Sequence, residues 1–437
     1  MRNVYPSEIA IDPWAGPPRR AAVKVPGSKS LTNRALILAA LAKGPTTLTD
    51  ALDSEDTRVM VRALQTLGLE VEHRPEERTI QIEGCGGKFP ESEAQLDLAN
   101  SGTSLRFLTA MLATGRGTYR LDGTPRMRQR PIQDLLDSLK GLGANASSDN
   151  GTGCPPVTIK ADGLDGGFAF VRGDVSSQFL SGLLMALPYA RDMTTVEVDG
   201  VLVSIPYVTM TLALMETFGI SVVNRKNRRF DIKPGTYQGQ KLAIEPDASA
   251  ASYFFALAAI TGGTVTVEGL GSTSLQGDVA FVDILEHMGC RVERESHRTT
   301  VTGGPLRSVD IDMNAVSDTV MTLAVVALFA EGVTRIRNVA HIRHKETDRI
   351  AAVAAELRKL GASVEETSDG LLIAPPPPDQ LHGASIKTYD DHRMAMSFAL
   401  AGLKIPDVVI LDPGCVAKTY PGFWEDFEAL RPPQGPA

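Results

Sequence analysis

Short polar and cationic segments precede apolar stretches at several places along the chain. Lys29 and Ser30 come just before one such stretch, and Arg34 follows one turn later. Similar segments recur at Asn100-Ser101-Gly102-Thr103-Ser104, which Arg106 follows, and at Ser176-Ser177-Gln178, Asp247-Ala248-Ser249, Ser317-Asp318 and Asp390-Asp391-His392-Arg393. If each stretch is a helix, its N-terminus offers unpaired N–H groups and a partial positive charge, which together favour a bound anion. A Lys or Arg there opposes the helix dipole unless an anion is present.

Simple helix capping is the competing interpretation, because Ser, Thr and Asp are the usual N-cap residues. Two loops add further cations. Arg126, Arg128 and Arg130 occupy three of five positions between Pro125 and Pro131, and residues 343–349 (RHKETDR) carry mixed charge before another apolar stretch. Arg binds carboxylates and phosphates in a bidentate manner, and Lys serves as a point charge or proton carrier. The alternative for each loop is ordinary surface charge.

Metal and nucleotide motifs are weak. His341, His344 and Glu346 could imitate a metal site, as could Asp390-Asp391-His392, but neither set has a well-spaced further ligand. The chain has no GxxxxGK[ST] segment, no GxGxxG after a predicted strand and no GxSxG segment. We therefore expect neither a metal nor a cofactor.

An internal repeat organises these motifs. Five glycines that follow apolar residues are spaced by 75, 76, 70 and 72 residues, namely Gly68, Gly143, Gly219, Gly289 and Gly361. Gly in this position is the common cap at the end of a helix. The pattern also predicts six more apolar helices, at 33–42, 103–113, 178–188, 249–260, 318–330 and 393–403. Strands are predicted after five of them, at 118–121, 194–198, 264–267, 333–336 and 408–411.

Six copies of one unit, the last cut short near Phe427, favour an α/β protein of two domains with three units each. Pro26 and Pro246 mark the points where we expect the chain to cross between the domains. Generic α/β periodicity is the alternative explanation of the repeat.

Composition excludes several classes of protein. The chain has 437 residues, of which 43% are hydrophobic and 22% charged, and a net charge of −8, which disfavours a nucleic-acid partner. The apolar segment 321–330 is shorter than the ~18 residues of a membrane span, and the N-terminus lacks an apolar signal core. The four cysteines show no CxxC spacing, as is usual in a reducing compartment. We therefore expect a cytoplasmic protein that binds small, multiply anionic molecules.

Seven long motifs resemble those of the 5-enolpyruvylshikimate-3-phosphate (EPSP) synthases, a family of enolpyruvyl transferases. They are PGSKSLTNRALILAALA, LANSGTSLRFLTA, DGTPRMRQRPI, DVSSQFLSGLLMA, RHKETDRI, DDHRMAM and DPGCVAKTYPGFW. The first begins at Pro26 and the last contains Pro421. The resemblance implies two similar domains, each of three βαβαββ units in an inside-out α/β barrel. The first would span residues 27–245, and the second residues 1–26 with 246–437. The active site would lie in the cleft between them.

The resemblance also implies the reaction, in which the 5-hydroxyl of shikimate 3-phosphate attacks phosphoenolpyruvate and phosphate leaves a tetrahedral intermediate. Asp318 would be the base, Glu346 the proton donor to the methylene carbon, and Lys29 a further catalytic residue. Shikimate 3-phosphate would contact Lys29, Ser30, Arg34, Ser176, Ser177, Gln178, Ser204, Tyr207, Asp318, His341 and Lys345. Phosphoenolpyruvate would contact Lys29, Gly102, Arg130, Gln178, Glu346, Arg349, Arg393 and Lys418.

Two residues depart from the family pattern. His341 stands where familiar members have an Asn that contacts the sugar phosphate, and Phe107 stands where well-known plant and enteric members have Pro. A histidine can still donate one hydrogen bond. Because Gly102 has no side chain, the resemblance also implies room for glyphosate, an inhibitor that mimics phosphoenolpyruvate.

Two other functions could explain part of this pattern. A UDP-N-acetylglucosamine enolpyruvyl transferase has the same fold, but usually carries a reactive Cys in the loop that corresponds to residues 122–132, and this loop has none. A non-catalytic anion-binding protein would not need both Asp318 and Glu346. We expect a monomer that binds two small substrates and contacts neither membrane nor nucleic acid.

Overall fold

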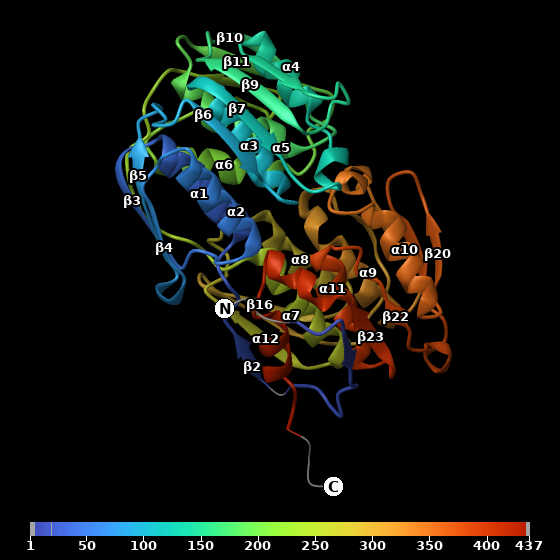
Figure 1. The fold of residues 1–437 in the computed structure, drawn as a ribbon. Coiled ribbons are helices and arrows are strands. Elements are labelled where there is room, and N and C mark those ends of the chain that lie inside the picture. The colour runs from blue at the N-terminus through green and yellow to red at the C-terminus, as the bar shows by residue number, and fades with distance from the viewer. Residues whose placement is uncertain (1–4, 19, 434–437) are drawn as a thin grey trace. The chain divides into compact units, whose positions relative to one another are not determined.

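The computed structural model describes residues 5–18 and 20–433. Contacts divide the chain into two compact units (Figure 1): unit 2 is Gly27–Ile244, and unit 1 combines Met1–Pro26 with Glu245–Ala437. The chain therefore passes from unit 1 to unit 2 after Pro26 and returns after Ile244. Residues 1–4, 19 and 434–437, which the sequence assigned to the second domain, lie outside the described residues.

Unit 2 contains three repeats. The first consists of α1 (Lys29–Leu41), β3 (Lys43–Thr49), α2 (Glu55–Thr66), β4 (Val71–Arg74), β5 (Thr79–Cys85) and β14 (Lys241–Ala243). The second consists of β6 (Glu93–Asp97), α3 (Gly102–Leu112), β7 (Arg116–Asp122), α4 (Gln133–Gly141), β8 (Asn145–Ser148) and β9 (Val157–Asp162). The third consists of β10 (Gly167–Arg172), α5 (Ser177–Ala186), β11 (Thr194–Asp199), α6 (Ile205–Thr217), β12 (Val223–Arg225) and β13 (Arg229–Ile232).

Unit 1 contains the other three. The fourth consists of β2 (Ala21–Val23), α7 (Ala248–Thr261), β15 (Thr264–Glu268), α8 (Phe281–His287), β16 (Arg291–Arg294) and β17 (Arg298–Thr302). The fifth consists of β18 (Asp310–Asp312), α9 (Val320–Val326), β19 (Thr334–Arg337), α10 (Arg349–Lys359), β20 (Ser363–Glu366) and β21 (Leu371–Ala374). The sixth consists of β22 (Ser385–Ile386), α11 (His392–Ala399), β23 (Val408–Leu411), α12 (Phe423–Ala429) and β1 (Glu8–Ile11).

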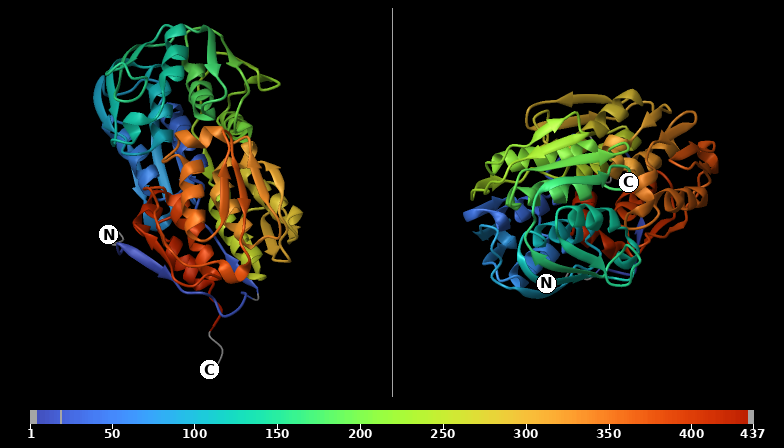
Figure 2. Two further views of the ribbon diagram at one scale, coloured as in Figure 1. Left: turned by 90° about the vertical axis from the view of Figure 1, so that its right-hand side faces the viewer. Right: turned by 90° about the horizontal axis from the view of Figure 1, so that it is seen from above.

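Each complete repeat forms a four-stranded sheet of one topology. In the order β6-β7-β9-β8, the first pair is parallel and the other two pairs are antiparallel, and the same arrangement recurs in four further sheets. The sixth sheet has three strands in the order β1-β23-β22 (Figure 2). Here the single strand β1, which pairs antiparallel with β23, takes the place of the two antiparallel strands found in the other sheets. The predicted α/β repeat of six units is confirmed.

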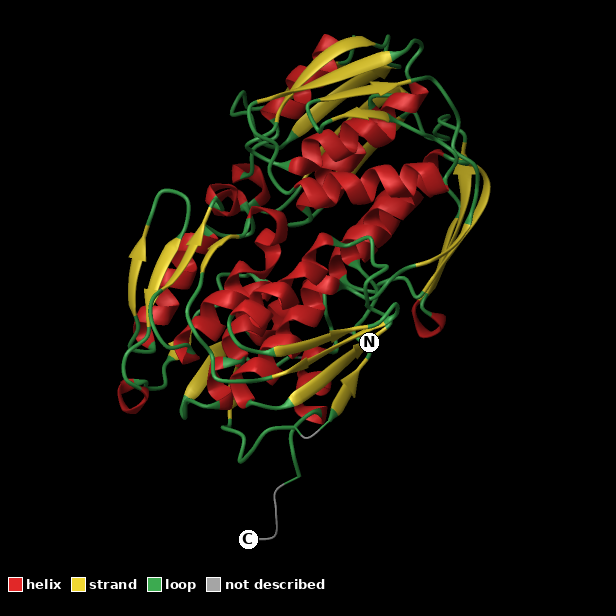
Figure 3. Cartoon of the chain, turned by 180° about the vertical axis from the view of Figure 1, so that it is seen from behind, coloured by secondary structure: helices red, strands yellow, loops and turns green. Residues whose placement is uncertain are grey.

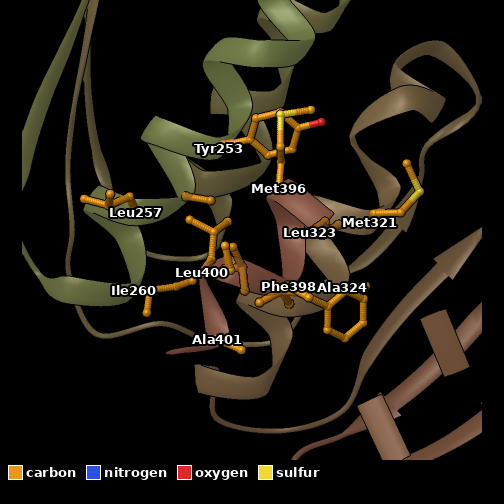
Figure 4. Packing of buried hydrophobic residues seen from close by; sticks show 14 of the residues in the cluster. Tyr253, Leu257, Ile260, Met321, Leu323, Ala324, Met396, Phe398, Leu400 and Ala401 are labelled. Carbon is orange, nitrogen blue, oxygen red and sulfur yellow. The ribbon is translucent and has the colours of Figure 1, made fainter. Parts of the chain in front are cut away.

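Within each unit the sheets lie outside and the long apolar helices lie inside (Figure 3). All 14 residues of α7 are buried. A helix that is apolar on every face is stable only when other elements surround it. In unit 1, Tyr253, Leu257 and Ile260 of α7 pack in the same cluster as side chains of α9 and α11 (Figure 4).

The glycines that end the second helix in each of the first five repeats adopt the left-handed conformation. Their φ angles are 81° at Gly68, 92° at Gly143 and Gly219, 113° at Gly289 and 98° at Gly361. A side chain strains this conformation, so glycine ends the helix there. These predicted helix ends are confirmed.

The predicted start of the fifth apolar helix was wrong. A 3₁₀ segment, Asn314–Thr319, precedes α9, and Val316 within it has non-helical backbone angles. Asp318 does not cap a helix, since its carboxylate accepts hydrogen bonds from Arg349 and Arg393. Ser317-Asp318 before an apolar run looks like a cap in the sequence, but here the side chain has distant partners.

Candidate active site

The residues singled out from the sequence fall into two groups, one in each unit. Unit 2 holds Lys29, Ser30, Arg34, Gly102, Arg130, Ser176, Ser177, Gln178, Ser204 and Tyr207. Unit 1 holds Asp318, His341, Lys345, Glu346, Arg349, Arg393 and Lys418. In both units they cluster at or before helix starts.

The start of α1 places Lys29 and Ser30. Ser28 caps this helix, because its hydroxyl accepts a hydrogen bond from the backbone N–H of Leu31 at 3.4 Å. Lys29 is the first helical residue, and its Nζ lies 3.6 Å from Oδ2 of Asp56. The helix start therefore carries both its ordinary cap and a cation that capping does not require.

Arg34 lies one turn further along α1 and is 2% exposed. Its guanidinium donates to the hydroxyl of Thr211 at 2.7 Å and to the backbone carbonyls of Ser30 at 3.0 Å and Tyr207 at 3.2 Å. It also stacks 5.2 Å from the ring centre of Phe107. Within the described residues, no carboxylate lies within 4 Å of Arg34. Burial lowers the pKa of Arg34 from 12.5 to about 10, so it remains a cation at neutral pH.

Gly102 and Arg130 lie in direct contact. Ser101 caps α3, and Arg130 donates to the backbone carbonyl of Asn100 at 3.1 Å. A Cβ atom on Gly102 would lie 2.4 Å from Nη2 of Arg130, which is too close. The missing side chain thus lets a 3%-exposed guanidinium lie against the start of α3. A buried cation of this kind is stabilised when an anion binds beside it.

Gln178 is held by Arg106, a residue noted in the sequence but given no role there. Nη1 of Arg106 donates to Oε1 of Gln178 at 2.6 Å, and Nε2 of Gln178 donates to the hydroxyl of Thr103 at 3.1 Å. Another Arg106 nitrogen donates to the carbonyl of Pro131 at 3.2 Å. Arg106 therefore fixes the orientation of the Gln178 amide and links α3, α5 and the arginine-containing loop.

The remaining residues of this group lie at two helix starts. Ser176 caps α5, accepting from the N–H of Gln178 at 3.3 Å, and Ser177 is buried beside it. Ser204 immediately precedes α6 with φ of 53°, an uncommon conformation for a residue with a side chain. Tyr207 lies in the first turn of α6, and its ring contacts Arg34. The structure therefore brings Arg34 and Tyr207 together.

Arg349 is the centre of the group in unit 1. It is 1% exposed and begins α10. It donates to three carboxylates: Nε to Asp391 at 2.8 Å, Nη2 to Glu346 at 2.9 Å and Nη1 to Asp318 at 3.2 Å. Burial alone would lower the pKa of Arg349, but Asp391, Glu346 and Asp318 outweigh burial and raise it. One permanently charged guanidinium therefore holds both predicted acid–base carboxylates.

Each of these two carboxylates has further cations beside it. Nη2 of Arg393 donates to Asp318 at 2.7 Å, and Nζ of Lys345 lies 4.0 Å from the same carboxylate. Nζ of Lys418 donates to Glu346 at 2.9 Å. Four cations thus surround three carboxylates, and this excess of positive charge suits an anionic substrate.

His341 lies in a 3₁₀ segment, Ala340–His344, and is 5% exposed. Burial, with a contribution from Lys345, lowers the pKa of His341 from 6.5 to about 3. The imidazole is therefore neutral at ordinary pH, with one donor nitrogen and one acceptor nitrogen. In this respect it resembles the amide of Asn.

Three further features of the described residues bear on function. No group of three or more His, Cys, Asp or Glu side chains there is arranged to hold a metal ion. No helix among them is long and apolar enough to cross a membrane. A cavity of about 890 Å³ lies within unit 1 at the C-terminal ends of the apolar helices, lined mainly by apolar residues and Pro375–Pro378. None of the candidate residues lines this cavity, so we do not assign the cavity to the candidate active site.

Comparison with known proteins assigns the chain to a family. Residues 15–427 match the family model described as EPSP synthase (3-phosphoshikimate 1-carboxyvinyltransferase). The chain belongs to the EPSP synthase family. The resemblance seen in the seven sequence motifs is thereby confirmed.

Individual members of the EPSP synthase family are similar to this chain in sequence or in structure over nearly its whole length. A 3-phosphoshikimate 1-carboxyvinyltransferase of Nostoc punctiforme is 49% identical over 412 residues, 94% of this chain and 96% of that protein. A chloroplastic one of Nicotiana tabacum is 50% identical over 439 residues, 96% of this chain and 84% of that protein. A solved structure of EPSP synthase from Acinetobacter baumannii matches with a TM-score of 0.80 at 27% identity, covering 97% of this chain and 98% of that one. The predicted fold class is confirmed.

Proposed function

We propose that the protein transfers the enolpyruvyl group of phosphoenolpyruvate to the 5-hydroxyl of shikimate 3-phosphate and releases phosphate, a step of chorismate and aromatic amino acid biosynthesis. Membership of the EPSP synthase family over residues 15–427 supports the substrates. The structural observation that carries the chemistry is the binding of Asp318 and Glu346 by the single guanidinium of Arg349. Family and relatives favour this reaction over transfer to UDP-N-acetylglucosamine.

The first half of the reaction is an addition. Asp318 removes the proton of the 5-hydroxyl as its oxygen attacks C2 of phosphoenolpyruvate, while Glu346 gives a proton to the methylene carbon. Arg393 donates to Asp318 and Lys345 lies beside it, so both orient this carboxylate, and Lys418, which donates to Glu346, passes it a proton or holds a substrate oxygen. Positioned acids and bases of this kind each contribute ~10²–10⁴ in rate.

The second half is an elimination. A proton leaves the new methyl group, the C–O bond to the phosphate breaks, and the enol double bond forms again. Glu346 accepts the proton, and Lys29, Arg130, Arg349, Arg393 and Lys418 stabilise the departing phosphate and the carboxylate. Preorganised charges contribute most where charge develops in the transition state.

The unit 2 residues serve binding in this proposal. Arg34 and Arg130 are buried, and within the described residues neither has a carboxylate within 4 Å. An uncompensated buried cation is costly, and a substrate carboxylate or phosphate removes that cost. Ser30, Ser176, Ser177, Ser204 and Tyr207 add hydroxyl groups to the contacts of shikimate 3-phosphate, and Gln178 adds an amide.

The reaction is tested by measuring phosphate release from phosphoenolpyruvate with purified protein. Release with shikimate 3-phosphate, and none with UDP-N-acetylglucosamine, is the expected result. Release only with the second acceptor would establish the alternative transferase. Tight binding of shikimate 3-phosphate without any release would establish an anion-binding protein.

Gly102→Ala should weaken phosphoenolpyruvate binding. The new Cβ would lie 2.4 Å from Nη2 of Arg130, so the guanidinium must move. Loss of one good charge-assisted contact corresponds to about a tenfold increase in KM for phosphoenolpyruvate, with kcat less affected. We further propose that the wild type is inhibited by glyphosate and the variant less so. Steady-state kinetics without and with millimolar glyphosate test the KM and the inhibition, respectively. An unchanged KM for phosphoenolpyruvate in the variant would contradict the expected loss of binding.

His341→Asn should preserve activity. Since the pKa of His341 is lowered to about 3, its ring is neutral, and an amide can supply the same donor. We expect kcat and both KM values to stay within about threefold from pH 6 to 9, whereas His341→Ala should raise the KM for shikimate 3-phosphate.

The unfolded chain binds a proton at His341 below pH 6.5 and the folded one does not. Wild type should therefore lose stability relative to His341→Asn as pH falls below 6.5.

We also propose that the enzyme is monomeric and cytoplasmic. The four cysteines, Cys85, Cys154, Cys290 and Cys415, are free thiols, as suits a reducing compartment. Sedimentation equilibrium should give the 46.7 kDa mass of one chain.

A further inference from the structure

Glu356 is a fully buried carboxylate of α10 that the proposed reaction does not use. It is 0% exposed and lies on the same helix as Arg349, two turns further along. Its Oε2 accepts from Nζ of Lys359 at 2.7 Å and from the backbone N–H of Lys387 at 3.0 Å. Its Oε1 accepts from the hydroxyl of Tyr389 at 2.7 Å. Glu356 thus binds two points of the segment that leads into α11.

That segment has an unusual backbone. Tyr389 and Asp390 are consecutive residues with left-handed φ angles of 58° and 56°. For residues with side chains this conformation is unfavourable, and it persists only where surrounding contacts hold it. Burial and the hydrogen bond to Glu356 raise the pKa of Tyr389 to about 12, so its hydroxyl remains a donor. The Glu356–Tyr389 bond is one of the contacts that hold the strained pair.

The strained pair directly precedes Asp391, which serves two groups at once. Asp391 caps α11 through the N–H of Arg393 at 3.0 Å, and its other oxygen accepts from Nε of Arg349 at 2.8 Å. Asp391 is 0% exposed. The direction of the backbone at Tyr389-Asp390 therefore decides where Asp391 meets both arginines.

We propose that Glu356 and Tyr389 are positioning residues for the two arginines that hold phosphoenolpyruvate. Glu356 binds the Tyr389 hydroxyl, and this bond fixes the left-handed turn that presents Asp391 to Arg349 and Arg393. The inference rests on the proposed function, because it needs both arginines to contact that substrate. Neither residue touches a reacting atom, so their effect appears in substrate binding before it appears in chemistry.

Tyr389→Phe tests the proposal with the loss of one oxygen atom. We expect the KM for phosphoenolpyruvate to rise about fivefold and that for shikimate 3-phosphate to change less than twofold. Glu356→Ala removes the acceptor of the Tyr389 hydroxyl and should have a larger effect in the same direction. The Glu356→Ala, Tyr389→Phe double variant should be no worse than Glu356→Ala alone, because both changes remove the same hydrogen bond. If Glu356→Ala does not fold, the kinetics of Tyr389→Phe decide.

Tyr119→Phe is the matched control. Its hydroxyl also makes buried hydrogen bonds, to the carbonyls of Glu91 and Arg116 at 3.0 Å, but lies in unit 2 among no candidate residues. It should leave both KM values unchanged. Full wild-type phosphate release with an unchanged KM for phosphoenolpyruvate in Tyr389→Phe would overturn the inference, as would a lower melting temperature with unaltered kinetics. Absence of release by the wild type would instead overturn the proposed function.

Discussion

Asp318→Asn should lower kcat by about 10²–10⁴, the usual contribution of a positioned base, while the protein stays folded. The Asn oxygen can still accept one of the two hydrogen bonds that Asp318 receives, from Arg393 at 2.7 Å on Oδ2 and from Arg349 at 3.2 Å on Oδ1. It cannot accept the proton of the 5-hydroxyl. The KM values should therefore change much less than kcat. Single-turnover measurement of phosphate release checks this directly.

Asp310→Asn is the control for that change. Asp310 lies on β18 of the same repeat, is exposed, and pairs with Arg337 at the surface. Surface ion pairs contribute little, so its kinetics and melting temperature should match those of the wild type. An Asp318→Asn enzyme with full turnover would remove Asp318 from the role of base.

Arg349→Met should be the most destabilising single change among the candidate residues. It removes the guanidinium that all three carboxylates share; Asp318 keeps Arg393 and Glu346 keeps Lys418, but the fully buried Asp391 loses its arginine partner. Removing one partner from a buried ion pair costs about 3–5 kcal/mol, because the remaining charge is buried and uncompensated.

Tryptophan fluorescence during urea denaturation provides the measurement. Both tryptophans of the chain, Trp14 and Trp424, are buried in unit 1, so their signal reports the unit that contains Arg349. Arg358→Met on the same helix is the control, since its side chain is 45% exposed and pairs with Glu366 at the surface. It should shift the midpoint little. Equal midpoints for the two variants would contradict the central role of Arg349.

Most of the fold could be predicted because its signals are local. Gly68 and the four equivalent glycines end helices for a reason that lies in their own backbone. The apolar helices are recognisable because each is buried on nearly every side, as α7 illustrates. The fifth helix was the exception. Asp318 looks like a cap in sequence, and only its partners 31 and 75 positions away explain why it is not one.

The site was harder to predict, because its geometry depends on contacts between repeats. The charged segment around Arg349 could equally be surface charge in the sequence, yet Arg349 is 1% exposed and joins carboxylates from three separate segments. Asp391 belongs to a segment that could imitate a metal site in the sequence, and in the structure it binds Arg349. Arg106 was seen as one more cation and in fact orients Gln178, 72 positions away. Residue types indicated the chemistry, but not which side chains meet.

The pairing of β1 with β23 bears on how the chain is made. Glu8 lies opposite Leu411, and the Tyr5 hydroxyl donates to the carbonyl of Pro421, 416 positions later. Ribosomes add ~5–20 residues per second, so the first strand emerges at least ~20 seconds before its partner exists. Unit 2, which is one continuous stretch, can fold during this interval. Until Val408–Leu411 has been made, Glu8–Ile11 has no partner strand, and an unpaired strand edge favours aggregation.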